Sequence, residues 1–167
     1  LLTHNRVKGE IAAVLTTLLK ARPIGYYFHD RALLTCAPAG LSTEADGTFV
    51  SFESLKSGRV RMVEGAEGYV ELEGAPDMVL EVVSPSSVRK DTVTLRDLYG
   101  RAGVDEYWLV DARGTKPRFD ILRPRGGKLA AAPARGGWLT SAVFGKSFRL
   151  VRRIDEMGHP SYLLDCR

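Results

Sequence analysis

The sequence has 167 residues, of which 44% are hydrophobic and 26% are charged, and this composition excludes a disordered chain and a coiled coil. Its net charge of +4 is compatible with a polyanionic partner without requiring one, and no apolar run is long enough to cross a bilayer. We therefore expect one globular domain over residues 1–167 that makes no contact with a membrane.

A helix, two strands and a turn are predicted for the first third of the chain. Apolar side chains recur at helical spacing over residues 4–21, and a proline and a glycine then end the helix. Residues 26–37 have the composition of a strand, and a second, shorter strand is expected over residues 48–52. The Asp46-Gly47 pair that precedes the second strand is typical of a hairpin turn.

The middle of the chain contains its most apolar strand. Residues 53–68 are polar and punctuated by glycines, which predicts a loop or a short helix, and residues 69–73 alternate as a strand does. Residues 78–83 form an apolar, β-branched run that only Glu81 interrupts. Such a run predicts a central strand that is covered on both faces.

A strand, a helix and a second strand form the next unit. Residues 91–102 place apolar side chains on one helical face, and Asp91 stands where it can cap the helix. Residues 106–111 have the pattern of another buried strand. Because a helix joins the two strands, we expect residues 78–83 and 106–111 to be parallel neighbours.

Strand-like segments close the chain. Residues 119–122 are typical of a strand edge, and residues 124–137 are rich in Gly, Ala and Pro, which predicts a flexible surface turn. Short apolar segments continue through residues 138–165. Together the elements predict an α/β fold, in which a mixed sheet carries a helix on each face.

Glu81 is the residue that most needs a chemical explanation. An ionised carboxylate inside an apolar strand is costly unless it is paired or binds a metal. Side chains alternate along a strand, so Asp77 and Glu81 share a face and can supply oxygen ligands to a hard cation such as Mg²⁺. Bound magnesium suits phosphodiester hydrolysis because it neutralises phosphate charge and activates a water. The structural alternative is that Glu81 pairs with an arginine and that Asp77 belongs to the turn after Pro76.

Other polar residues also have two interpretations. Asp46 is either the turn residue of an Asp-Gly hairpin or a further carboxylate that converges on Glu81. Glu10 lies off the main apolar stripe of the first helix, where a glutamate is ordinarily solvated. Lys90 and Arg96 follow the acidic strand, where basic side chains suit a phosphate-bearing ligand, but a solvated helix face explains them equally well.

The histidines and cysteines suggest no catalytic group. His4 near the start of the first helix is expected to be a surface or capping residue. Cys36 and Cys166 are far apart and lack the spacing of metal ligands. They are therefore predicted to be free thiols in a reducing cytoplasm.

At this point the sequence resembles the Uma-two family of restriction-endonuclease-like proteins, which belongs to the PD-(D/E)XK nuclease superfamily. The residues that carry the resemblance are Pro76-Asp77-Met78-Val79-Leu80-Glu81-Val82-Val83-Ser84-Pro85-Ser86-Ser87, Asp91, Leu98-Tyr99, Ala102-Gly103-Val104 and Glu106-Tyr107-Trp108-Leu109-Val110-Asp111. The resemblance is specific over residues 76–111 and extends more weakly over most of the chain.

The resemblance implies a fold and an activity. It implies a restriction-endonuclease-like αβββαβ core, cleavage of DNA that depends on Mg²⁺ or Mn²⁺, and a homodimer that cuts both strands. Asp46 and Glu81 match the superfamily's two metal-binding carboxylates, and Asp77 matches the family's own proline-aspartate pair. Glu10 corresponds to a helix glutamate found in many superfamily members. The family also usually has strand material before the first helix, so we expect a missing N-terminal strand segment.

The lysine of the superfamily motif is absent from its usual position. Val83 stands two residues after Glu81, where the motif has its lysine, and the family supplies a lysine from the following helix instead. Leu95 aligns with that second position, whereas Lys90 is the nearest lysine and Arg96 lies one residue further on.

Three hypotheses follow from these observations. The first is a magnesium-dependent DNA endonuclease in which Asp46 and Glu81 bind the metal, Asp77 supports them, and Lys90 or Arg96 contacts the scissile phosphate. The second is a catalytically inactive nuclease-fold module that binds nucleic acid or a protein partner. The third is a folded domain whose acidic residues are structural.

Overall fold

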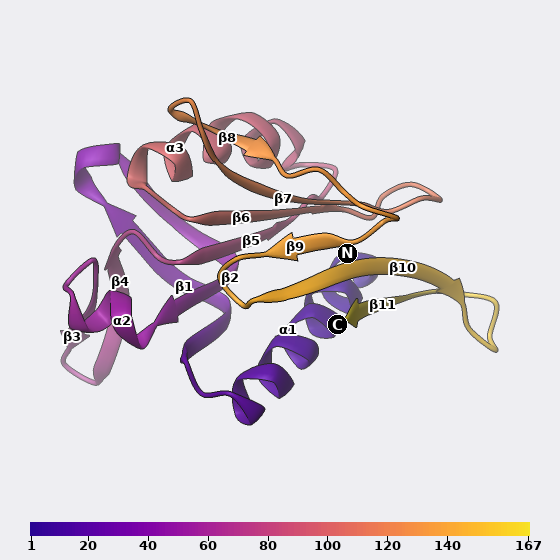
Figure 1. Cartoon of the computed structure of the whole chain (residues 1–167), viewed down its shortest axis with the longest axis horizontal. Helices are drawn as coiled ribbons and strands as arrows, with labels where there is room; N and C mark the ends of the chain where they lie inside the picture. Colours follow the sequence, from indigo (N-terminus) through magenta and orange to yellow (C-terminus); the bar gives the residue numbers. More distant parts are fainter.

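The computed structural model describes residues 1–167, with the exception of the side chain of Arg31 (Figure 1). The helical elements are α1 (Leu2–Ala21), the 3-10 turn η1 (Ala37–Ala39), α2 (Phe52–Lys56), the π-helical turn η2 (Lys90–Thr94) and α3 (Leu95–Ala102). The strands are β1 (Gly25–Cys36), β2 (Leu41–Ser51), β3 (Val60–Gly65), β4 (Gly68–Gly74), β5 (Met78–Val82), β6 (Glu106–Asp111), β7 (Arg118–Arg125), β8 (Lys128–Ala131), β9 (Leu139–Ser141), β10 (Lys146–Ile154) and β11 (Pro160–Cys166).

The strands form a large mixed sheet and a small antiparallel one. The large sheet has eight strands in the order β3-β4-β1-β2-β5-β6-β7-β8, and the small sheet has the order β11-β10-β9. Strands β5 and β6 are parallel, with Met78 beside Glu106 and Val82 beside Val110, which confirms the predicted strand–helix–strand unit. The elements α1, β1, β2, β5, α3 and β6 follow the expected αβββαβ order, and the β3–β4 hairpin is inserted between β2 and β5.

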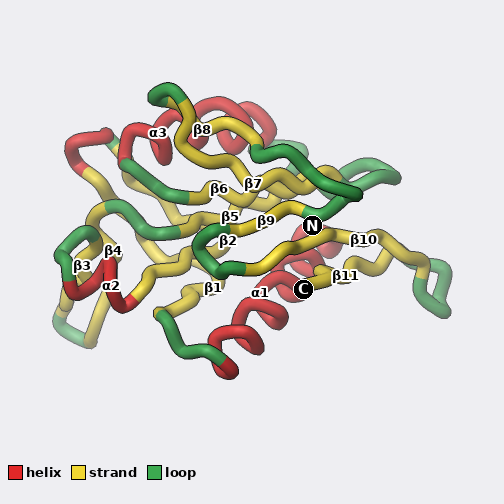
Figure 2. Tube along the Cα trace, viewed as in Figure 1, coloured by secondary structure: helices red, strands yellow, loops and turns green.

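Helices cover both faces of the large sheet, as predicted for an α/β fold (Figures 1 and 2). The apolar stripe of α1, formed by Val7, Ile11 and Leu15, packs in one core with alternate residues of β5 such as Leu80. The intervening residues of β5, such as Val79, pack in a second core on the α3 side. The alternation explains why β5 is apolar except for Glu81, because both of its faces are buried.

The small sheet shares the α1 side of the large sheet. Phe148 of β10 and Leu164 of β11 belong to the same core as the stripe of α1, and β11 lies beside α1 (Figure 1). No helix among the described residues is long and apolar enough to span a bilayer. Cys36 and Cys166 are both free thiols.

The prediction of a turn at Asp46-Gly47 is wrong. Both residues lie inside β2, which pairs with β1 from Gly25 opposite Ser51 to Cys36 opposite Leu41. The chain reverses instead at η1 and Gly40, whose φ of 66° is accessible to glycine at little cost. The local preference of Asp-Gly for a turn is overridden because the cross-strand pairs of the long β1–β2 ladder stabilise the fold more than a two-residue hairpin would.

Three other predictions of local structure are also corrected. Residues 60–65 form the strand β3, which pairs with β4. Gly65 and Gly68 flank the tight turn of this hairpin. Residues 128–131 form β8 and pair with β7, so residues 124–137 are not simply a flexible turn. Asp91 does not cap a helix; it lies inside η2 and is 2% exposed.

Candidate active site

The candidate active site lies where β2 separates from β5. Antiparallel pairing between the two strands covers only three positions and ends at Gly47 opposite Leu80. One step further, the same register puts Asp46 opposite Glu81. There the Val82 N–H donates to Asp46 Oδ2 at 2.8 Å, so a side chain replaces the next main-chain partner. The two predicted metal ligands therefore lie on neighbouring strands at the same end of β5.

Two basic groups from the first turns of α1 contact Asp46. His4 Nε2 lies 3.2 Å from Asp46 Oδ2, and Lys8 Nζ lies 3.0 Å from Oδ1. Lys8 Nζ also contacts Asp30 Oδ1 at 2.7 Å. Burial alone would lower the pKa of Lys8, but the hydrogen bonds to Asp30 and Asp46 outweigh this effect and raise the pKa above its usual value. Lys8 is therefore charged and forms ion pairs with two carboxylates.

Glu81 lies near the same end of β5 and is almost fully buried. It is 4% exposed, and the Tyr99 hydroxyl of α3 donates to Glu81 Oε1 at 2.6 Å. Burial raises the pKa of Glu81 to about 8, the hydrogen bond from Tyr99 opposes that rise, and the negative charges of Asp46 and Asp91 add to it. The positive charge of Lys90 lowers the pKa of Glu81 by less, so burial decides the direction of the shift.

Asp91 is a third acidic group near this point. The Ser87 hydroxyl donates to Asp91 Oδ2, and the Tyr107 hydroxyl donates to the Asp91 carbonyl at 2.7 Å. Burial raises the pKa of Asp91, with a smaller contribution in the same direction from Asp46. Asp91 lies in the π-helical turn η2 with its side chain buried, whereas the sequence predicts it at the exposed start of a helix.

Lys90 lies at the edge of this acidic group. Its side chain is exposed, and its positive charge lowers the pKa of both Glu81 and Asp91. Val83 and Leu95, which occupy the two positions where a motif lysine is expected, are both 3% exposed and belong to the α3-side core. Lys8 and Lys90 are therefore the lysines that the structure brings to the site.

Asp77 lies at the opposite end of β5. It accepts hydrogen bonds from the Ser51 N–H at 2.7 Å and from the Ser51 and Ser54 hydroxyls, both at 2.9 Å. These contacts fix the turn into α2, and four residues of strand separate Asp77 from Glu81 by about 13 Å. The structure does not bring Asp77 to the other two predicted metal ligands.

Glu10 and Arg96 also have partners outside the site. Glu10 Oε1 accepts a hydrogen bond from the Leu164 N–H at 2.8 Å and so ties α1 to β11. Arg96 donates from Nε and Nη2 to the Leu129 carbonyl, at 2.8 and 2.6 Å, and so ties α3 to β8. Neither side chain contacts Asp46 or Glu81.

The donor set fits a hydrated divalent cation. Among the side chains that the structure describes, no three from His, Cys, Asp and Glu are grouped closely enough to hold a metal by themselves. Magnesium usually keeps several waters and needs only one or two carboxylates from the protein. Asp46 and Glu81 supply hard oxygen ligands of that number. Burial is the main cause of the raised pKa of Glu81, the negative charges of Asp46 and Asp91 raise it further, and a bound cation would offset those charges. The cluster is therefore suited to Mg²⁺ or Mn²⁺ with water completing the coordination.

Tyr27 places an unpaired hydroxyl next to Asp46. Its oxygen is buried and has no hydrogen-bond partner among the described residues. A Cβ added to Gly47 would lie 2.2 Å from this oxygen, so only glycine leaves room for it. Burial raises the pKa of Tyr27 well above its usual value, and the charge of Asp46 adds to the rise, so the hydroxyl remains a donor.

A cavity lies beside the candidate site at the start of α1. It has a volume of about 440 Å³ and is lined by residues that include His4, Val82, Val83 and Pro85. His4 and Val82, which both contact Asp46, line this cavity, whereas Asp46 and Glu81 do not.

Several site residues were missed by sequence reasoning. His4 and Lys8 are four residues apart, so they share a helix face, and this spacing was a signal that both could reach one partner. Tyr99 lies in the helix predicted over residues 91–102, and nothing local in the sequence distinguishes its hydroxyl from that of any core tyrosine. Asp91 was interpreted as a cap because it stands at the expected helix start.

Comparisons with known proteins identify the family and the fold. The model of the Uma2 family, described as "Putative restriction endonuclease", matches residues 2–151. No curated protein matches the sequence significantly. A solved structure from Anabaena variabilis ATCC 29413, described as a putative nuclease belonging to DUF820, is similar with a TM-score of 0.62 and 17% sequence identity, and the match covers 85% of this chain and 73% of that one. At this identity the structural likeness extends to the fold.

Proposed function

The chain belongs to the Uma2 family, and on that premise we propose that it is a nuclease that hydrolyses phosphodiester bonds of DNA with Mg²⁺ or Mn²⁺. The proposal is supported by the positions of Asp46 and Glu81 near one end of β5: Asp46 accepts a hydrogen bond from the Val82 N–H, and the charge of Asp46 contributes to the raised pKa of Glu81. Two carboxylates from neighbouring strands, one of them buried, are what a hydrated divalent cation requires.

Asp46 and Glu81 would hold the metal ion. When bound, the ion would offset charge on the scissile phosphate and favour ionisation of an attacking water. The Val82 N–H and His4 orient the Asp46 carboxylate, and Tyr99 orients that of Glu81. These contacts fix the carboxylates before substrate binds, which reduces the reorganisation needed during the reaction.

Lysine side chains would stabilise the phosphate. Lys90 is exposed at the edge of the acidic cluster, and we assign it the contact with the scissile phosphate that the motif lysine makes elsewhere. Lys8 is held against Asp46 and can contact a phosphate oxygen that approaches this carboxylate. In this proposal Asp77, Glu10 and Arg96 only stabilise the fold. Their hydrogen bonds go to residues outside the candidate site.

The direct test is cleavage of supercoiled plasmid DNA with Mg²⁺ or Mn²⁺. We expect wild type to nick or linearise the plasmid, and we expect Asp46→Asn and Glu81→Ala to abolish the reaction. Glu10→Gln, which leaves the acidic cluster intact, is the matched control and should cleave at nearly the wild-type rate. Absence of cleavage by wild type with either metal, on supercoiled and single-stranded DNA alike, would refute the proposal.

One observation favours a second function, that of an inactive nuclease-fold module that binds nucleic acid or a protein. Both positions where the family has its lysine are filled by buried aliphatic residues, Val83 and Leu95. A module of this kind would bind DNA without cutting it in any divalent metal. Saturable DNA binding combined with unchanged plasmid would therefore select the second function over the first.

The proposal includes an assembly and a location. Cutting both strands of a duplex needs two sites, so we propose that the nuclease works as a homodimer in the cytoplasm, where Cys36 and Cys166 remain reduced. Light scattering of the purified protein measures its mass, and a monomer at all concentrations would rule out the dimer.

A further inference from the structure

A hollow of about 350 Å³ lies between β1 and β4. The two strands pair in parallel only over three positions, starting with Leu33 opposite Glu71. Before that point β1 follows β2, with a register shift between His29 and Ala32, and it has no pairing with β4. The gap therefore leaves a strand edge whose main-chain polar groups have no ladder partner, and such an edge can bind another molecule.

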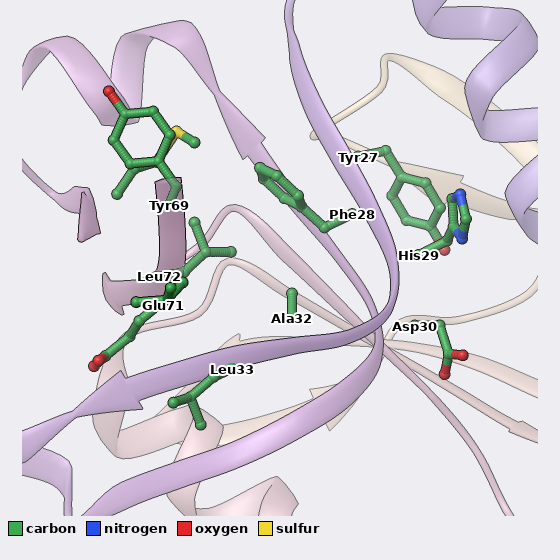
Figure 3. A pocket seen from close by; sticks show the side chains of 11 residues that line it. Tyr27, Phe28, His29, Asp30, Ala32, Leu33, Tyr69, Glu71 and Leu72 are labelled. Atoms are coloured by element: carbon green, nitrogen blue, oxygen red, sulfur yellow. The ribbon is translucent and has the colours of Figure 1, made fainter. Parts of the chain in front are cut away.

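Aromatic and aliphatic side chains line the gap. Figure 3 shows Phe28 and Tyr69 on two sides of the hollow, with Ala32 and Leu72 below them. Tyr69 is 64% exposed and its neighbour Val70 is 59% exposed, so an aromatic ring and an aliphatic side chain stand in solvent at the rim. Aromatic walls over an apolar floor favour a planar ring that stacks, and the volume is that of a small-molecule site.

The hollow adjoins the candidate active site through one ion pair. Asp30 lines the hollow, and Lys8 Nζ contacts Asp30 at 2.7 Å and Asp46 at 3.0 Å. A nucleic acid with a phosphate at Lys8 and Asp46 would therefore carry an adjacent base to the rim of the hollow. Two carboxylates line the hollow: Asp30, which Lys8 contacts, and Glu71, whose Oε1 already accepts a hydrogen bond from the Thr35 hydroxyl. A carboxylate has two oxygens and can accept further hydrogen bonds, so Glu71 Oε2 can serve as an acceptor for a bound base.

We propose that this hollow binds one unpaired nucleobase of the strand being cleaved, and specifically a base with an exocyclic amino group. The proposal rests on the nuclease function proposed above. The amino group suits the acceptors at the rim, and the ring stacks between Phe28 and Tyr69. A fully paired duplex keeps its bases stacked inside the helix, so the preferred substrate is single-stranded or locally unpaired.

The test measures binding separately from cleavage. An oligodeoxynucleotide that contains 2-aminopurine, a fluorescent base with an exocyclic amino group, is titrated with protein in the presence of a chelator. We expect stacking to change its fluorescence, and we expect Tyr69→Ala to weaken binding about 10-fold while Tyr69→Phe retains it. Met157→Ala, at an exposed apolar position outside the hollow, is the matched control and should bind as wild type does. Oligo-dC or oligo-dA should compete better than oligo-dT.

Two results would overturn the proposal. One is equal binding by wild type and Tyr69→Ala, which is expected to fold because Tyr69 is exposed. The other is a fully paired duplex that competes as well as the single strand. Absence of cleavage of both plasmid and single-stranded DNA, with Mg²⁺ and with Mn²⁺, would refute the nuclease function and leave the binding result standing, so the two failures are distinguishable.

Discussion

Replacing Glu81 by glutamine should change how the stability of the metal-free protein depends on pH. The pKa of Glu81 is about 8 in the folded protein against a usual value of 4.5, because burial disfavours the ionised form. One pKa unit corresponds to about 1.4 kcal/mol, so ionisation of Glu81 destabilises the fold by at most about 5 kcal/mol. That is a large share of the total stability of an ordinary domain, which is about 5–15 kcal/mol.

The direction of the effect follows from the proton balance. Between pH 4.5 and 8 the unfolded chain loses the proton of this carboxyl while the folded protein keeps it. Stability contributed by Glu81 is therefore present below pH 4.5, decreases as the pH rises towards 8, and stays low above that. Glutamine cannot ionise, and its amide oxygen can still accept the hydrogen bond from Tyr99.

Urea unfolding at several pH values, with a chelator present, measures this effect. We expect Glu81→Gln to match wild type near pH 5 and to exceed it by several kcal/mol at pH 9, up to the limit of about 5 kcal/mol. Glu156→Gln, at an exposed position, is the control and should show no such divergence. A difference between Glu81→Gln and wild type that stays constant from pH 5 to pH 9 would refute the assignment of a raised pKa to Glu81.

Three further substitutions separate structural from functional roles. Tyr27→Phe removes a buried hydroxyl that has no partner among the described residues, so thermal unfolding should show unchanged or higher stability. Thr48→Val removes a second such hydroxyl and is the control. Cleavage that is reduced in Tyr27→Phe but not in Thr48→Val would show that the Tyr27 hydroxyl acts in the reaction. Asp77→Ala leaves the turn into α2 without its acceptor and should lower the free energy of unfolding by about 3 kcal/mol, while calorimetry should find metal affinity unchanged. Lys8→Met removes the positive charge beside Asp46 and should tighten the binding of Mn²⁺ measured by calorimetry. Weaker binding would contradict the electrostatic effect of Lys8 on Asp46.

The strand–helix–strand unit was predictable because its signals are local. Residues 78–83 are apolar except for Glu81 because both faces of β5 are buried, and the helix and strand that follow have regular patterns of their own. By contrast, the long β2 was hidden by the Asp46-Gly47 pair, whose local preference for a turn yields to pairing with a distant strand. Local propensity is a weak guide wherever such long-range pairing decides the structure.

The candidate site was predictable in part for the same reason. Glu81 is conspicuous in the sequence because a carboxylate interrupts an apolar strand. Its partner Tyr99 is not, since a hydroxyl on an apolar helical face gives no sign of what it contacts. The approach of His4 and Lys8 to Asp46 depends on how α1 crosses the sheet, which no local pattern specifies. The chemistry of single residues could thus be inferred, whereas their assembly required the fold.

The central claim is that Asp46 and Glu81 share one divalent cation. Titration with Mn²⁺, followed by calorimetry and by the paramagnetic resonance signal of the free ion, tests it directly. We predict one saturable site per chain in wild type, its loss in Asp46→Asn and in Glu81→Gln, and its retention in Asp77→Asn, which lies at the other end of β5. Saturable binding that survives both Asp46→Asn and Glu81→Gln would contradict the claim.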